Sequence, residues 1–296
     1  MARANGIELC YETFGSPSNE PLVLIMGLAA QMVMWDDEFC SELASRGFYV
    51  IRFDNRDIGK STRLTGGGPI KVMDLLKLRF LKIPPAAVYK LWDMAADVVG
   101  LLDTLGIPSA HIVGASMGGM IGQELAIRYP DRVRSLTSIM SSTGNHRLPQ
   151  PTREASAILM APPPKTKEEY IERFAQTWKV LRAGSFPQDE IKDRQRAELT
   201  FSRGLNPAGV SRQLRAILAS GPRNDRLRTV RVPTLVIHGD VDPLVRLEGG
   251  KDTAAAIPGA KLLIIKGMGH AIPMPIWPQI IGAITEHAMG SKKAAA

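Results

Sequence analysis

The chain has 296 residues, of which 45% are hydrophobic and 22% charged, and it carries a formal net charge of +8. This composition is typical of a soluble globular protein with a substantial core, and no apolar run reaches the roughly 18 residues that a membrane-spanning helix needs. The N-terminus shows no secretory-signal pattern, and the two cysteines, Cys10 and Cys40, form neither a disulfide framework nor a metal site. We therefore expect a cytoplasmic protein with reduced thiols.

The positive charge is concentrated in one segment. Between residues 143 and 232 the sequence holds 17 Lys and Arg residues against 9 Asp and Glu residues, which accounts for the whole excess of the chain. We favour a solvated helical surface for these residues, and the alternative is a basic lid that attracts anionic substrates. Nucleic-acid binding is not expected, because the arginines are scattered among acidic residues and no basic motif interleaved with aromatic residues occurs.

The first part of the chain alternates short apolar strands with amphipathic helices. Strands are predicted at 7–14, 22–26, 48–53 and 110–113, and helices at 36–46, 70–81 and 92–105. The helix at 70–81 combines leucines with basic residues. We expect its apolar stripe to pack against the protein, and the alternative is that it borders an apolar substrate entrance.

The remainder of the chain resumes the alternation only after a long helical segment. Strands are predicted at 133–140, 234–238 and 261–265, and helices at 251–257 and 278–287. This order indicates the α/β class, with a mostly parallel central sheet and helices on both faces. We assign the core domain to 1–143 and 233–290, a helical lid to 144–232, and a disordered tail to 291–296.

One short motif carries the chemistry. Ser116 stands between Gly114 and Gly118, directly after the apolar strand 110–113 and before a helix that ends ahead of Tyr129. In the order strand, sharp turn, helix, the pattern G-x-S-x-G strains the serine backbone and exposes its hydroxyl. The glycines leave room for the strand and the helix to approach each other closely.

A serine hydroxyl needs a neighbouring base, and that base needs an acid to orient it. His270 follows the predicted strand 261–265, and Asp242 follows the strand 234–238, so both lie in loops at the carboxyl ends of parallel strands, where sites form. Asp240 is the rival acid, although its place near the strand end suits a role in shaping the turn. Four other histidines are weaker candidates for the base: His111, His146, His238 and His287.

Attack on a carbonyl creates an oxyanion that two backbone amides must stabilise. The first candidate is the amide of Met117, the residue after the serine. The second is the amide of Leu28, in the loop that follows the strand 22–26, where Gly27 permits a sharp exit.

With these residues the sequence resembles the α/β-hydrolase fold superfamily over nearly its whole length. The segment 53–61 is similar to the family turn D-x-R-G-x-G-x-S, with Asp57 in place of the first glycine. Together with Met26-Gly27 in place of His-Gly, this form looks most like the aclacinomycin methylesterase and carboxylesterase branch. The resemblance implies that Asp54 and Arg56 brace the loop beside the site, and it places the family's lid where this chain has its helical insertion.

We therefore expect a serine hydrolase that cleaves carboxylic esters through a covalent acyl-enzyme, with Ser116, His270 and Asp242 as its triad. No metal or organic cofactor is required, and the expected partner is a small ester or lactone, neutral or anionic. An enol-lactonase or a carbon–carbon bond hydrolase would use the same triad. A ligand sensor with little turnover is the alternative from another class.

Overall fold

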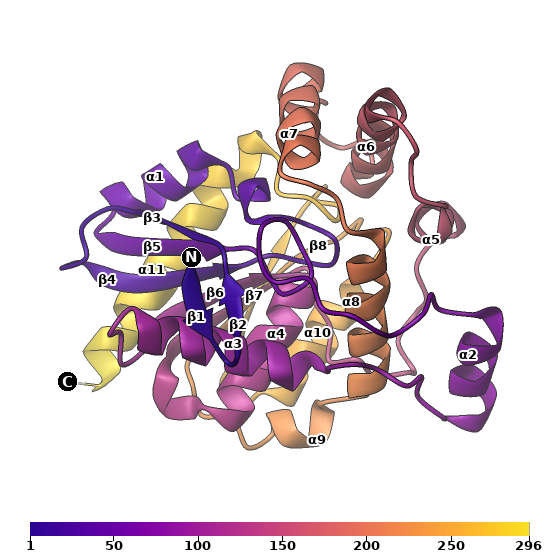
Figure 1. Cartoon of the computed structure of the whole chain (residues 1–296). Helices are drawn as coiled ribbons and strands as arrows, with labels where there is room; N and C mark the ends of the chain where they lie inside the picture. Colours follow the sequence, from indigo (N-terminus) through magenta and orange to yellow (C-terminus); the bar gives the residue numbers. More distant parts are fainter. Residues whose placement is uncertain (296) are drawn as a thin grey trace.

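The computed structural model describes residues 1–295, and the side chains up to residue 290 except those of Val72 and Arg79. A twisted sheet of seven strands lies between two layers of helices (Figure 1). The strands stand in the order β3-β5-β4-β6-β7-β8-β9, and only β3 pairs antiparallel with its neighbour β5. Their bounds are β3 Tyr11–Phe14, β4 Glu20–Ile25, β5 Phe48–Phe53, β6 Ala110–Ala115, β7 Val133–Ile139, β8 Thr234–Gly239 and β9 Lys261–Ile265. The predicted α/β class with a mostly parallel sheet is confirmed.

The sheet is covered on both faces because its central strands are apolar on both sides. On β4, Val23 and Ile25 belong to one core cluster, while Leu22 and Leu24 belong to the other. The first cluster packs against helices α3, α4 and α10, and the second against α1 and α11. These helices are α1 Asp37–Ser45, α3 Leu91–Thr104, α4 Met117–Arg128, α10 Leu247–Ala256 and α11 Trp277–Ala295. Strand β6 is the central strand of the sheet and ends at Ala115. Ser116, the next residue, therefore lies near the middle of the sheet's edge.

The two ends of the chain differ from the prediction. The predicted strand 7–14 is divided, because β2 (Ile7–Leu9) pairs with β1 (Ala2–Ala4) in a separate hairpin. Asn5 and Gly6 turn this hairpin with φ of 48° and 79°, a conformation that these two residue types tolerate. The predicted disordered tail, 291–296, is helical as far as Ala295, which the helix propensities of Lys and Ala explain, and residue 296 lies outside the described residues.

Five helices lie between β7 and β8: α5 Arg153–Met160, α6 Lys167–Arg182, α7 Glu190–Ser202, α8 Pro207–Ser220 and α9 Asn224–Leu227. Helix α8 contacts α3 of the core, whereas α6 and α7 pack together and rise from the body of the molecule (Figure 1). A further helix, α2 (Val72–Leu76), continues into a π-helical turn, η2 (Lys77–Leu81). Within residues 1–295, no helix has both the length and the apolar character of a membrane span. The division into a core and a lid at 144 and 232 stays a prediction.

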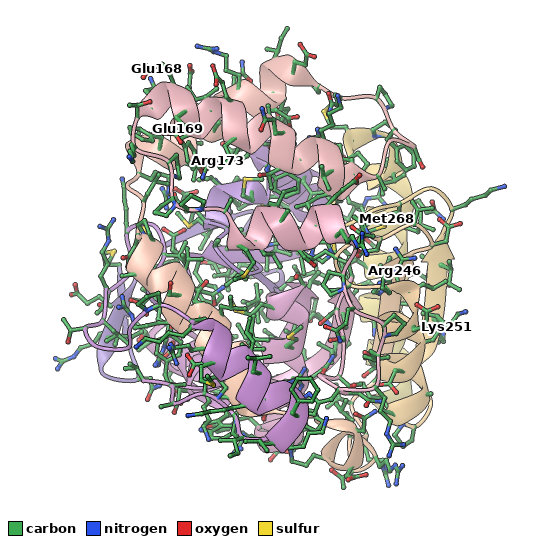
Figure 2. All side chains as sticks on the ribbon, turned by 90° about the vertical axis from the view of Figure 1, so that its right-hand side faces the viewer. Glu168, Glu169, Arg173, Arg246, Lys251 and Met268 are labelled. Carbon is green, nitrogen blue, oxygen red and sulfur yellow. The ribbon has the colours of Figure 1, made fainter. Side chains whose placement is uncertain are left out.

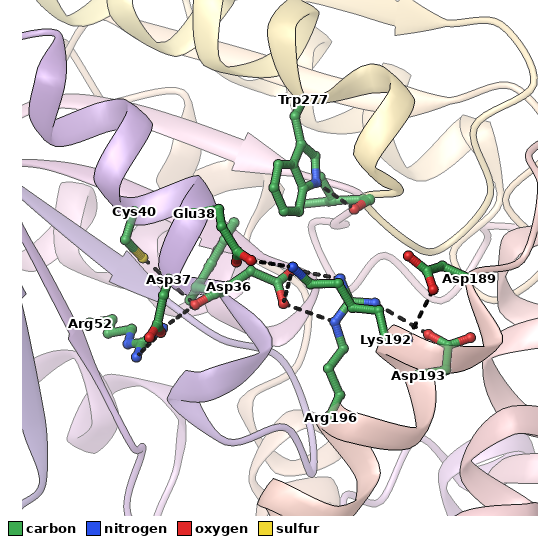
Figure 3. A network of polar contacts seen from close by, with 12 residues as sticks. Asp36, Asp37, Glu38, Cys40, Arg52, Asp189, Lys192, Asp193, Arg196 and Trp277 are labelled. Carbon is green, nitrogen blue, oxygen red and sulfur yellow. Dashed lines mark hydrogen bonds and ion pairs between the residues drawn. The ribbon is translucent and has the colours of Figure 1, made fainter.

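Ion pairs to the core neutralise much of the positive charge of this insertion. Lys192 and Arg196 of α7 reach Asp36 and Glu38 at the start of α1 (Figure 3). The same pattern continues along the insertion with Arg203 on Asp54, Arg212 on Asp57, Arg215 on Asp74 and Arg226 on Glu124. These paired side chains therefore do not belong to the expected solvated surface. They are also not available to attract anionic substrates, because their ion pairs join the insertion to the rest of the chain.

Candidate active site

Ser116 occupies the sharp turn between β6 and α4 that the motif predicts. Its backbone has φ 54° and ψ −119°, a strained conformation for a residue with a side chain. A Cβ at Gly118 would lie 2.0 Å from the carbonyl oxygen of Ile25, and one at Gly114 would lie 2.2 Å from the carbonyl oxygen of Gly118. Gly118 is therefore required by the close approach of the turn to β4, and Gly114 by the close approach of β6 to the start of α4. Ser141, in the segment after β7, holds the turn, since its hydroxyl donates to the Ser116 carbonyl at 2.8 Å.

The structure brings Ser116, His270 and Asp242 together from three separate loops. His270 Nε2 lies 3.0 Å from Ser116 Oγ, and His270 Nδ1 lies 2.8 Å from Asp242 Oδ2. The other carboxylate oxygen, Asp242 Oδ1, accepts hydrogen bonds from the amides of Leu244 at 2.9 Å and Val245 at 2.8 Å. Asp242 and His270 are both buried, whereas Ser116 is partly exposed. This geometry can pass a proton from the serine to the imidazole and hold the imidazole in one orientation.

The rival residues have other partners. Asp240 Oδ1 accepts from the amide of Gly267 at 2.6 Å, which fits the expected role in the turn. His111 Nδ1 lies 2.8 Å from Ser135 Oγ inside the sheet, and His287 Nε2 lies 3.2 Å from two backbone carbonyls. His146 is exposed, in the segment after β7.

His238 is fully buried near the end of β8. Its Nε2 must carry the proton, because it lies 2.8 Å from the carbonyl oxygen of Val245, which can only accept. Its Nδ1 is buried without a hydrogen-bond partner among the described residues. Burial lowers the pKa of His238, so the ring is neutral although Asp242 Oδ2 lies 3.7 Å from Nε2. The sequence could have indicated that His238 lies beside the acid, because it stands near the end of β8, four residues before Asp242.

The two candidate oxyanion donors border the serine. Neither the Leu28 amide nor the Met117 amide donates to a protein acceptor in the described part of the chain, so both are available to a ligand. A Cβ at Gly27 would lie 3.1 Å from Ser116 Cβ, which shows how closely the Leu28 loop passes the serine. The Met117 amide also stands at the first position of α4, where the helix dipole favours negative charge.

Side chains that the sequence alone did not reveal hold the Leu28 loop. Asn55 Nδ2 donates to the Met26 carbonyl at 2.9 Å, and Gln213 Oε1 accepts from the Ala29 amide at 3.1 Å. Gln213 comes from α8, so the helical insertion contributes directly to the shape of this loop. Of the two residues expected to brace it, Asp54 accepts from the Met32 amide at 2.8 Å, which agrees with that role.

Arg56 acts further from the site. Its Nε lies 2.6 Å from Asp97 Oδ2 on α3, and burial is nearly complete for both side chains. The segment 53–61 thus contacts the segment after β4 through Asp54 and helix α3 through Arg56.

A groove of about 430 Å³ adjoins the loop that follows Asp242. Leu244, Val245 and Arg246 line it on that side, and Leu75 and Leu78 of the α2 segment line it on the other. Figure 2 turns this side of the molecule, with Arg246 labelled, toward the viewer. The groove joins the site's acid loop to the helix that the sequence placed either against the protein or at a substrate entrance.

Comparison with known proteins adds an independent finding. The family model of the alpha/beta hydrolase fold matches residues 20–275. The rhodomycin D methylesterase DauP of Streptomyces sp. (strain C5) is 29% identical over 97% of this chain and 97% of its own. The 3-oxoadipate enol-lactonase 2 of Acinetobacter baylyi is 26% identical over 84% of this chain and 81% of its own.

Solved structures share the fold. The meta-cleavage product hydrolase CumD of Pseudomonas fluorescens IP01 superposes with a TM-score of 0.73, at 21% identity over 97% of this chain and 96% of its own. A thermophilic esterase from Thermogutta terrifontis gives a TM-score of 0.66, at 25% identity over 96% of this chain and 94% of its own.

Proposed function

Because this chain belongs to the alpha/beta hydrolase fold family, we propose that it is a serine hydrolase that cleaves carboxylic esters through a covalent acyl-enzyme. The observation that carries the proposal is the chain of hydrogen bonds from Ser116 through His270 to Asp242. The methylesterase relatives support an ester substrate, since the similarity to them spans 97% of both chains. The expected relation to the methylesterase branch is confirmed at the level of the family.

In the proposed reaction His270 Nε2 accepts the hydroxyl proton while Ser116 Oγ bonds to the ester carbonyl carbon. Collapse of the tetrahedral intermediate breaks the bond to the alcohol, which leaves with the proton from His270. Water then gives a proton to His270 and attacks the acyl-enzyme. When the second tetrahedral intermediate collapses, the acid is released and His270 returns the proton to Ser116 Oγ. Asp242 holds the ring with its proton on Nδ1 and stabilises the imidazolium. This sequence needs no cofactor.

The amides of Leu28 and Met117 would stabilise the negative charge on the intermediate. Within residues 1–295 neither amide has a protein acceptor, and Met117 N stands at a helix N-terminus. Loss of one such donor costs about 2.7–4 kcal/mol of transition-state stabilisation. The donors belong to the backbone, so this role does not depend on the side chains at these two positions.

Replacement of Ser116 by Ala tests the proposal. We expect turnover of a p-nitrophenyl ester to fall by at least about 1,000-fold, with an unchanged melting temperature. Ser138→Ala is the matched control, because Ser138 lies on the neighbouring strand β7 and its buried hydroxyl has no partner in the described structure. Full activity of Ser116→Ala would refute the proposal.

A panel of methyl esters, lactones and diketones separates the remaining alternatives. A preference for lactones would favour an enol-lactonase, which one relative is named for. Tight ligand binding with no burst of alcohol release would favour a sensor. The two free cysteines support a reducing, cytoplasmic compartment as part of the same proposal.

A further inference from the structure

The segment 72–83 presents large apolar side chains to solvent at the edge of the molecule. Figure 1 shows α2 projecting beyond the helices that cover the sheet. Phe80 is 71% exposed and Leu81 is 64% exposed, and Met73, Leu76 and Ile83 are also exposed. Scattered apolar residues on a surface are ordinary, but five exposed ones within eleven residues are a local concentration. We call these five residues the outer face.

The protein already uses the opposite side of the same segment. Leu75 and Leu78 are partly buried and line the groove beside the Asp242 loop. The outer face is therefore the side that stays exposed after the helix has packed. Helix α5 adds two further exposed apolar side chains, Leu159 and Met160. Figure 2 shows α2 and α5 on the same side of the molecule.

The segment that carries the outer face has a positive net charge. The segment 71–82 contains four basic residues and a single acid, Asp74. Lys71 and Lys77 are exposed on it. Asp74 does not offset them at the surface, because it pairs with Arg215 of α8 at 2.9 Å and accepts from the Lys71 amide at 3.0 Å. The segment thus combines the exposed apolar side chains of the outer face with exposed lysines.

We propose that the outer face docks the protein onto an anionic lipid surface. An amphipathic helical segment lies in the interface of a membrane when its apolar side chains enter the acyl boundary and its lysines meet anionic headgroups. The combination also distinguishes a membrane from a protein partner, because lysine is depleted in protein interfaces. Such docking is peripheral and does not involve a membrane-spanning helix. It is independent of the ester-hydrolase proposal.

Vesicle sedimentation tests this with two lipid compositions. The full chain is mixed with vesicles of phosphatidylcholine alone, or of equal parts of phosphatidylcholine and phosphatidylglycerol. We expect sedimentation with the anionic vesicles only. Binding should weaken as the ionic strength rises from about 0.01 M to about 1 M, because the Debye length falls from about 30 Å to about 3 Å. Failure to sediment with anionic vesicles at low ionic strength would overturn the proposal.

Variants locate the contact. The double change Phe80→Ser with Leu81→Ser should lower vesicle binding by at least about tenfold. The variant loses two apolar side chains that, in the proposed complex, are buried in the lipid. Ile191→Ser is the matched control, since Ile191 on α7 is 74% exposed but far along the chain from the outer face. Lys71→Gln with Lys77→Gln should reduce binding to anionic vesicles and its dependence on salt. Equal binding by the Phe80–Leu81 variant and the wild type would contradict the proposal.

Further measurements separate lipid docking from misfolding and from self-association. Melting temperatures show whether the variants are folded, and a soluble ester reports the active site separately from docking. Sedimentation velocity without lipid tests self-association. A dimer that disappears in the Phe80–Leu81 variant would show that the outer face joins two copies of this chain, which would also overturn the proposal.

Discussion

Asp57 and Arg212 form a buried, two-pronged ion pair that joins the loop after β5 to helix α8 of the insertion. Arg212 Nε lies 2.9 Å from Asp57 Oδ2, and Arg212 Nη2 lies 2.7 Å from Oδ1. Tyr89 also donates to Oδ2 at 2.8 Å, and the Leu64 amide donates to Oδ1 at 2.8 Å. The resemblance noted in the sequence places a glycine at this position, and Asp57 keeps the matching backbone with φ 71°. The contacts offset a backbone strain of about 1–3 kcal/mol.

Asp57→Gly should destabilise the protein, although it relieves the backbone strain at this position. The change leaves the Arg212 guanidinium buried without its carboxylate, which typically costs about 3–5 kcal/mol in the free energy of unfolding. Urea unfolding of the wild type and the variant measures this difference. Adding Arg212→Met should recover part of the loss, because the unpaired charge is then removed. A single variant as stable as the wild type would show that the pair contributes little.

Asp242→Asn should lower kcat by about 10,000-fold with little loss of stability. The amides of Leu244 and Val245 donate to Oδ1, so the asparagine oxygen must take that place and its NH₂ group must face His270. The NH₂ group then donates to His270 Nδ1, so the ring proton must lie on Nε2. A protonated Nε2 cannot accept the proton of Ser116.

Asp240→Asn is the control for this prediction. Its Oδ1 only accepts from the Gly267 amide, a bond that an asparagine oxygen can keep, so activity should stay near that of the wild type. If Asp240→Asn were the more damaging change, the assignment of the acid would have to be reversed.

The sequence predicted the elements that depend on local patterns, and it could not predict contacts made across the fold. Periodicity and turn residues located the strands of the sheet, and the order of Ser116, Asp242 and His270 indicated three loops at one edge. The pair of Asp57 and Arg212 joins residues 155 positions apart, so it depends on how α8 docks. For the same reason the charge count of 143–232 did not reveal that many of its arginines are paired.

The helix at 70–81 shows the same limit of local patterns. Its periodicity predicted an apolar stripe, and Leu75 and Leu78 do line a groove. Periodicity carries no information on which faces the rest of the protein covers, and Phe80 and Leu81 are left exposed.

Cys40 should resist thiol reagents in the folded protein. Cys40 is a buried residue of α1, and burial raises the pKa of its thiol to about 12, so almost no thiolate forms near neutral pH. Cys10 is partly exposed. A disulfide reagent should therefore modify about one thiol quickly in native protein and both after unfolding, and Cys10→Ser should remove the fast phase. Rapid modification of both thiols in the native protein would contradict the burial of Cys40.

Acid should destabilise the protein below about pH 6.5 through two histidines. Burial lowers the pKa of His238 and of His287 below the ordinary value of 6.5. Both rings are neutral in the folded and the unfolded state well above this pH, so they give no pH dependence of stability there.

As the pH falls through 6.5, the unfolded chain takes up protons that the folded protein does not, so the free energy of unfolding decreases. The decrease ends once the pH is below the lowered native pKa values. Urea titrations between about pH 8 and pH 5 measure it, and His287→Gln should reduce the slope. A slope that His287→Gln does not alter would show that this ring titrates equally in both states.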